Sequence, residues 1–174
     1  MRRTLLGVLL VVSVSGAVTT EARIPRVRAL SERTARLIDV GRALSPTIRA
    51  MLDRIDASDL ILQVDTKLDL GVPNAVTRLV TATPDFRYVR VSINPRLAPQ
   101  RRLELLAHEL QHVLEIAADT TVRDQDGMRD YFTRIGRRQA VTGTFETDAA
   151  MDVESVVRRE VGRAKSRDLA TLDR

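Results

Sequence analysis

The chain has 174 residues, a formal net charge of +5 and no cysteine, so it can form no disulfide and carry no cysteine-linked lipid. Aromatic residues make up only 3% of the chain, too few for a surface that stacks nucleic-acid bases. Basic and acidic residues are interspersed rather than grouped in blocks, and no nucleic-acid partner is expected.

The N-terminal segment has the layout of a secretory signal peptide. A positively charged start is followed by an apolar run over residues 5–14 and by small residues that end at Ala17. Residues 1–17 are therefore predicted to be a signal peptide, which makes the mature protein periplasmic or secreted, without stable membrane insertion. An uncleaved N-terminal anchor is the alternative, because the uncharged stretch over residues 4–20 is only slightly shorter than the roughly 20 residues that span a bilayer.

The rest of the chain has the length of one domain. Residues 18–26 are predicted to form a flexible tail and residues 27–170 a single domain. Hydrophobic periodicity and the turn residues between periodic segments predict the following elements in chain order: helices over 27–44 and 46–57, strands over 59–65, 75–83 and 86–93, a helix over 99–118, and helices over 128–137 and 145–165. The turn residues at 83–85 favour a β-hairpin between the last two strands.

The only two histidines of the chain, His108 and His112, enclose Glu109 in the pattern H-E-x-x-H, which is the signature of zinc-dependent hydrolases. On a helix, the four-residue spacing puts both imidazoles on one face, where they can bind the same metal ion. Glu109 then points aside and can polarise a water molecule that the metal activates. Apolar residues around most of the helix predict that it is buried, and buried imidazoles need partners. A structural histidine pair without a metal is the alternative.

A hydrolytic zinc site usually has three protein ligands and one position for water. Since the chain has no third histidine and no cysteine, the third ligand must be an aspartate or a glutamate. Glu146 is the preferred candidate, because a helix over 145–165 would turn it into the apolar stripe that packs on the core. Glu115 is the rival: it shares the histidine face, although three ligands from one straight helix converge poorly on one ion.

Two histidines on one helix, a glutamate between them and a further glutamate on a later helix resemble the gluzincin branch of the zincin metallopeptidases, in particular its minimal members. The resemblance covers roughly residues 59–165. It implies an α+β, zincin-like fold in which a small, mainly antiparallel sheet packs on the active-site helix and a C-terminal helix supplies the glutamate ligand. The strand before the metal helix, residues 86–93, would then form the edge of the substrate cleft.

The resemblance also implies an activity: an exported zinc metallopeptidase with one Zn²⁺ ion, held by His108, His112 and Glu146. Glu109 would be the general base toward peptide or protein substrates. A non-catalytic, zinc-stabilised binding module of the cell envelope is the alternative; in such a module Glu115 would close the site as a fourth ligand.

The chain departs from the gluzincin pattern at one position. Gluzincins often carry an acid four residues after the glutamate ligand, where it orients a histidine, but this position is Ala150 here. Either Asp119 or Asp152 is therefore expected to orient His108, or Glu146 is not the ligand. Tyr131 is the candidate for stabilising the oxyanion of the reaction.

Overall fold

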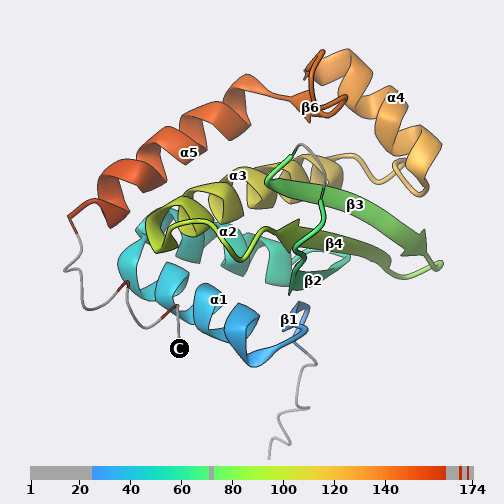
Figure 1. The fold of residues 1–174 in the computed structure, drawn as a ribbon. Coiled ribbons are helices and arrows are strands. Elements are labelled where there is room, and N and C mark those ends of the chain that lie inside the picture. Colours follow the sequence, from blue (N-terminus) through green and yellow to red (C-terminus); the bar gives the residue numbers. More distant parts are fainter. Residues whose placement is uncertain (1–24, 71–72, 164–168, 170–171, 173–174) are drawn as a thin grey trace, which may run out of the picture.

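A computed structural model of the chain describes residues 25–70, 73–163, 169 and 172 (Figure 1). The predicted signal peptide lies outside these residues. Within the described part of the chain, none of the helices combines the length and apolar character that crossing a bilayer requires. Arg26, at the end of the predicted tail, is attached to the folded chain: its main-chain oxygen accepts a hydrogen bond from Leu62 N, and its guanidinium lies over the Phe86 ring.

The fold is α+β, as expected, with the following elements in chain order: β1 (Val27–Ala29), α1 (Glu32–Leu44), α2 (Pro46–Asp56), β2 (Leu60–Thr66), β3 (Ala75–Ala82), β4 (Arg87–Ile93), α3 (Pro99–Ala118), α4 (Gln125–Ile135), β5 (Arg137–Arg138), β6 (Phe145–Glu146) and α5 (Asp148–Val161). The predicted helix over 99–118 is confirmed with the same bounds, and the predicted hairpin is confirmed as the antiparallel pair of β3 and β4.

The expectation of a mainly antiparallel sheet is wrong. The main sheet has the order β1-β2-β4-β3, and both β1 with β2 and β2 with β4 pair in parallel. The helix predicted over 27–44 begins later, because residues 27–29 form β1 and Ser31 caps α1 through a capping box with Thr34. The helices α1 and α2 thereby become the crossover that a parallel pair of strands needs.

One face of the main sheet packs on helices, and α3 lies between this sheet and α5 (Figure 1). Alternate strand residues point into this core, among them Leu62, Val64, Val89 and Val91, each fully buried. Because neighbours surround α3 on several sides, its apolar residues are buried around most of the helix, as the sequence predicts. The H-E-x-x-H segment is therefore carried by the most enclosed helix of the described residues.

A buried arginine attaches the end of α3 to the sheet. Arg87, the first residue of β4, is fully buried and forms a two-pronged ion pair with Asp59, at 2.8 Å on each side. Its Nη1 also donates to the main-chain oxygens of Ile116 and Asp119, both at 2.7 Å, and of Val122 at 3.1 Å. These oxygens lie at and beyond the C-terminus of α3, where helix carbonyls lack partners within the helix. Arg87 thus acts as a C-terminal cap for the helix that carries the motif.

Candidate metal centre

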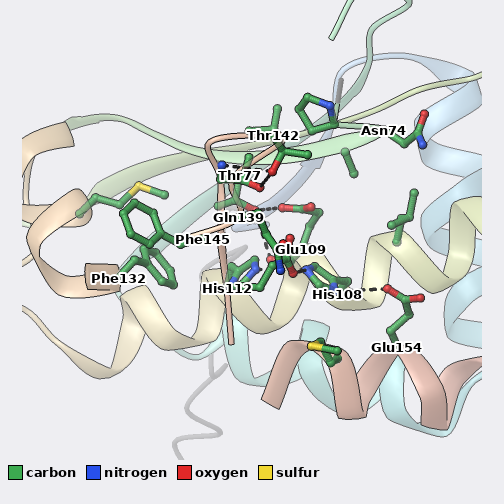
Figure 2. A pocket seen from close by; sticks show the side chains of 18 of the residues that line it. Asn74, Thr77, His108, Glu109, His112, Phe132, Gln139, Thr142, Phe145 and Glu154 are labelled. Carbon is green, nitrogen blue, oxygen red and sulfur yellow. Dashed lines mark hydrogen bonds and ion pairs between the residues drawn. The ribbon is translucent and has the colours of Figure 1, made fainter. Parts of the chain in front are cut away.

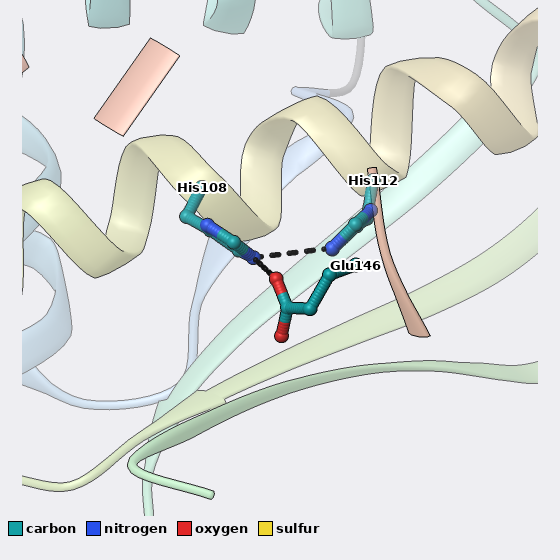
Figure 3. Close-up of side chains that lie close together, drawn as sticks. All are labelled: His108, His112 and Glu146. Carbon is teal, nitrogen blue, oxygen red and sulfur yellow. Dashed lines mark hydrogen bonds and ion pairs between the residues drawn. The ribbon is translucent and has the colours of Figure 1, made fainter. Parts of the chain in front are cut away.

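The two histidines of α3 direct the same ring atom toward one point (Figure 3). Their Nε2 atoms are 3.2 Å apart, and the side chains are 7% and 6% exposed for His108 and His112. Glu146 approaches this point from outside the helix, with its Oε2 at 2.8 Å from Nε2 of His108. One ligand atom from each of these three residues lies within 4.8 Å of the others, so the buried group could hold a metal ion.

Glu146 does not come from the C-terminal helix, and this part of the expected fold is wrong. It lies in β6, the second strand of a short hairpin with β5, and α5 begins only at Asp148. The helix starts there because Thr147 caps it, its hydroxyl accepting a hydrogen bond from Ala150 N. The hairpin therefore brings the glutamate to the histidines from one side, while α3 presents both rings from the other (Figure 3).

The spacing of the two imidazole nitrogens is compatible with a shared metal ion. At a tetrahedral zinc ion with Zn–N bonds of 2.0–2.1 Å, two nitrogen ligands lie about 3.3 Å apart, close to the 3.2 Å between the two Nε2 atoms. Without a cation, two imidazole nitrogens face each other and at most one of them can donate a proton usefully. Two imidazoles and one carboxylate are also the donor set of many hydrolytic zinc sites.

Glu115 orients His112 from the side of the ring that faces away from the cluster. Its Oε2 is 2.8 Å from Nδ1 of His112, and its Oε1 accepts a hydrogen bond of 2.7 Å from the Thr147 hydroxyl. With a proton on Nδ1, the Nε2 lone pair of His112 is free for a metal. Both carboxylate oxygens of Glu115 are thus engaged away from Nε2, so the structure does not bring this rival ligand into the cluster.

The carboxylate next to Nδ1 of His108 belongs to Glu154, and neither Asp119 nor Asp152 takes this place. The Oε2 atom of Glu154 lies 3.3 Å from Nδ1 of His108, close enough for an ion pair but at an angle unsuited to a hydrogen bond. Two arginines, Arg101 and Arg158, hold the other oxygen of Glu154. Asp119 instead accepts hydrogen bonds from Thr121, and Asp152 is exposed. Sequence spacing gave no sign of Glu154, which lies two turns into α5.

Glu109 is buried between α3 and β3. It is 6% exposed, and its Oε2 accepts a hydrogen bond of 2.6 Å from the Thr77 hydroxyl of β3. Burial raises the pKa of Glu109 above its usual range, more than the nearby His112 and the Thr77 hydroxyl lower it. A carboxylate with raised proton affinity next to the two histidines is suited to accept and release a proton.

Neighbouring charges also shift the pKa values of His108, Glu115 and Glu146. Burial would lower the pKa of His108, but Glu146 and the other carboxylates nearby raise it. Burial would also raise the pKa of Glu146 and of Glu115, yet the histidine partner of each carboxylate, together with Thr147 at Glu115, lowers it. The cluster therefore carries excess negative charge around two imidazoles, which favours a cation.

A pocket of about 470 Å³ opens onto the cluster (Figure 2). One end is apolar, with Phe132 and Phe145 beyond His112, and the other end is charged, with Glu154 beyond His108. Between them the pocket is bordered by the start of β3 and the segment before it, residues 73–77.

The edge of the pocket differs from the expected one. The strand over 86–93 is β4, which lies inside the sheet between β2 and β3, and β3 is the edge strand at the site. Farther along, the Gln125 side chain of α4 donates to Leu79 O, so that α4 occupies the later part of this edge. Tyr131, the predicted oxyanion donor, is not among the residues that line the pocket; it packs against Phe132.

Comparison with known proteins gives no match: no protein-family model fits the chain, and neither curated proteins nor solved structures show a significant similarity to it.

Proposed function

We propose that the protein is a zinc-dependent metallopeptidase of the zincin type, close to the gluzincins in its ligand set. The observation that carries this proposal is the convergence of both Nε2 atoms and Glu146 Oε2 on one buried point, with the Glu109 carboxyl beside it. Zinc would be held by His108, His112 and Glu146, and it supplies Lewis acidity that makes a water molecule acidic and polarises a carbonyl.

The protein residues have separate roles in this proposal. Glu109 accepts a proton from the attacking water and passes it to the amine that leaves, as a general base and then a general acid. Its buried position excludes bulk water, which strengthens the electrostatic interactions inside the site. Glu115 and Glu154 keep the histidine rings turned toward the ion, since both lie at the Nδ1 atoms.

A peptide substrate fits along the free edge of β3. Asn74 O accepts a hydrogen bond from Asn94 N toward the sheet, so by the alternation of strand hydrogen bonds the main chain of Ala75 and Thr77 faces outward. An extended peptide could add to this edge by main-chain hydrogen bonds, which recognise a backbone rather than a particular sequence. The apolar end of the pocket would accommodate one of its side chains.

A closed structural zinc site would favour the alternative, a non-catalytic binding module, but it needs a fourth protein ligand. Among the residues that the structure describes, the cluster contains three ligand residues. Glu115, which could have been the fourth, has both carboxylate oxygens hydrogen-bonded elsewhere. The arrangement supports an open coordination position and hence catalysis.

The experiment is to load the purified chain with zinc, measure its stoichiometry, and assay cleavage of a mixed library of quenched fluorescent peptides. We expect one zinc per chain and cleavage in the parent. Glu109→Gln should keep the zinc and lose cleavage by at least about a hundredfold, since general base catalysis contributes 10²–10⁴ in rate. Equal turnover by this variant and the parent would refute the proposed role of Glu109.

The compartment belongs to the same proposal. A signal peptide over residues 1–17 would deliver the enzyme to the periplasm or the exterior. Fractionation of cells that express the full chain, with N-terminal sequencing of the exported form, tests this. A product that begins near residue 18 is expected, whereas a chain that retains Met1 and sediments with membranes would indicate an uncleaved anchor.

A further inference from the structure

Thr77 connects the edge strand to the Glu109 carboxyl. It lies in β3 with its side chain on the helix-covered face, and it is 8% exposed. Its hydroxyl is 2.6 Å from Oε2 of Glu109 and 3.3 Å from the main-chain oxygen of the same residue. Within the described residues, no other side chain donates a hydrogen bond to this carboxyl.

The hydroxyl of Thr77 has one proton and two acceptors within reach. The contact with the carboxyl is much the shorter of the two and has the length of a hydrogen bond to an ionised acceptor. The proton therefore points to Oε2. This bond fixes one oxygen of Glu109, and within the described residues no side chain donates a hydrogen bond to the other, Oε1.

We propose that Thr77 is the positioning residue of the general base, an inference that rests on the proposed peptidase function. Its side chain holds Glu109 in the orientation that takes a proton, while its outward main chain belongs to the edge along which a peptide would lie. One residue thus determines both where the substrate backbone runs and where the base stands relative to it. Within the described residues, its hydroxyl bonds to Glu109 and to none of the three proposed metal ligands.

A purely structural role makes a different prediction. If Thr77 only satisfied a buried carboxyl, loss of the hydroxyl would lower the stability of the fold and leave turnover per folded molecule unchanged. A positioning role instead lowers kcat, because orientation of a base matters in the transition state, and leaves KM and zinc affinity almost unchanged.

The test uses the zinc-loaded full chain and three variants. Thr77→Val removes the hydroxyl and keeps the branched shape, Thr77→Ser keeps the hydroxyl, and Thr81→Val removes an exposed hydroxyl from the same strand as a control. Zinc affinity is measured by competition with a chromophoric chelator, and kcat and KM with a fluorogenic peptide that the parent cleaves.

We expect Thr77→Val to lose about tenfold or more in kcat, a fraction of the 10²–10⁴ that a general base supplies, with KM and zinc affinity within about threefold of the parent. Thr77→Ser should recover kcat to within about threefold, and Thr81→Val should match the parent. A kcat of Thr77→Val equal to that of the parent would overturn the inference, and so would a serine variant as slow as the valine variant.

A second measurement does not need peptidase activity. Acetohydroxamic acid binds zinc as its anion, and binding is favoured when a nearby base, here Glu109, takes up the proton that it releases. Calorimetric titration should show about tenfold weaker binding in Thr77→Val, and no further loss when this change is added to Glu109→Gln, because both changes remove the same function. Undiminished hydroxamate affinity in Thr77→Val would contradict the inference.

The outcomes separate the two proposals. A parent that binds zinc and hydroxamate but cleaves no peptide would count against the peptidase alone, while the hydroxamate affinities would still decide the role of Thr77. Cleavage by the parent together with an unaffected Thr77→Val variant would count against Thr77 alone. A parent that binds no zinc would overturn both.

Discussion

Replacing Arg87 by methionine should destabilise the protein more than any exposed arginine change. Methionine fills a similar length but donates no hydrogen bond. The variant loses the ion pair with Asp59 and leaves the main-chain oxygens of Ile116, Asp119 and Val122 without their donor. Breaking a buried ion pair from one side costs about 3–5 kcal/mol. Because the Asp59 side chain is 33% exposed and regains water, we expect the lower end, about 3 kcal/mol.

Urea unfolding of the metal-free chain, followed by far-UV circular dichroism, measures this cost. At a typical slope of about 2 kcal/mol per molar urea, a loss of about 3 kcal/mol lowers the midpoint by about 1.5 M. Arg90→Met is the matched control: Arg90 lies on the open face of the same strand and, among the described residues, bonds only to Gln63, so its loss should cost less than about 1 kcal/mol. Equal midpoint shifts in the two variants would refute the capping role of Arg87.

Three further predictions concern the cluster and the pH dependence of stability. Glu115→Gln should weaken the proposed zinc binding about 10- to 100-fold by chelator competition, because His112 loses its charged partner; unchanged affinity would contradict this. Gly136→Ala should weaken zinc binding about tenfold, since its Cβ would lie 2.9 Å from the main-chain oxygen of Glu146 and push the hairpin away; an affinity equal to that of the parent would show that the hairpin yields without cost. Arg87 lowers the pKa of Asp59 below its ordinary 3.8, so the stability from this pair is complete above that value and is lost as pH falls through the lower folded pKa. The gap between parent and Asp59→Asn in urea midpoint should therefore be complete at about pH 5 and shrink as the pH falls below 3.8, and a gap that stays constant on acidification would contradict the linkage.

The elements with strong periodicity were predictable from the sequence. The bounds of α3 and its burial followed from apolar residues around the helix, and the hairpin of β3 and β4 followed from turn residues between two alternating runs. The sheet topology was not predictable, because β1 has only three residues and its pairing with β2 depends on contacts between segments far apart in the chain.

In the candidate site, too, some residues were predictable from the sequence and others were not. His108, Glu109 and His112 are positioned by one helix, so local geometry was enough to bring them together. Glu146 lies beside them for a different reason from the one predicted: a helical wheel placed it in an apolar stripe, whereas the residue precedes the helix. The capping preference of Thr147 was the missed signal, since a threonine before Asp148 is a common start of a helix.

Contacts across the fold explain the remaining differences. Glu154 reaches His108 only because α5 packs along α3. β3 is an edge strand because it pairs with β4 on one side, while β2 pairs with the other side of β4. Neither fact has a local signature in the sequence. Their prediction needs the pairing of distant segments, on which spacing and periodicity carry no information.

The hairpin of β5 and β6 would make the proposed zinc affinity a measure of local opening. Two donors belong to a helix inside the core, but the third belongs to a strand of two residues that pairs only with another equally short one. A low concentration of denaturant should open the hairpin before the core unfolds, and a bound ion would then be held by His108 and His112 alone. Zinc affinity measured at increasing urea concentrations would thus report the opening of this hairpin. The loss of affinity should occur at urea concentrations where the circular dichroism of the whole fold is still that of the native protein.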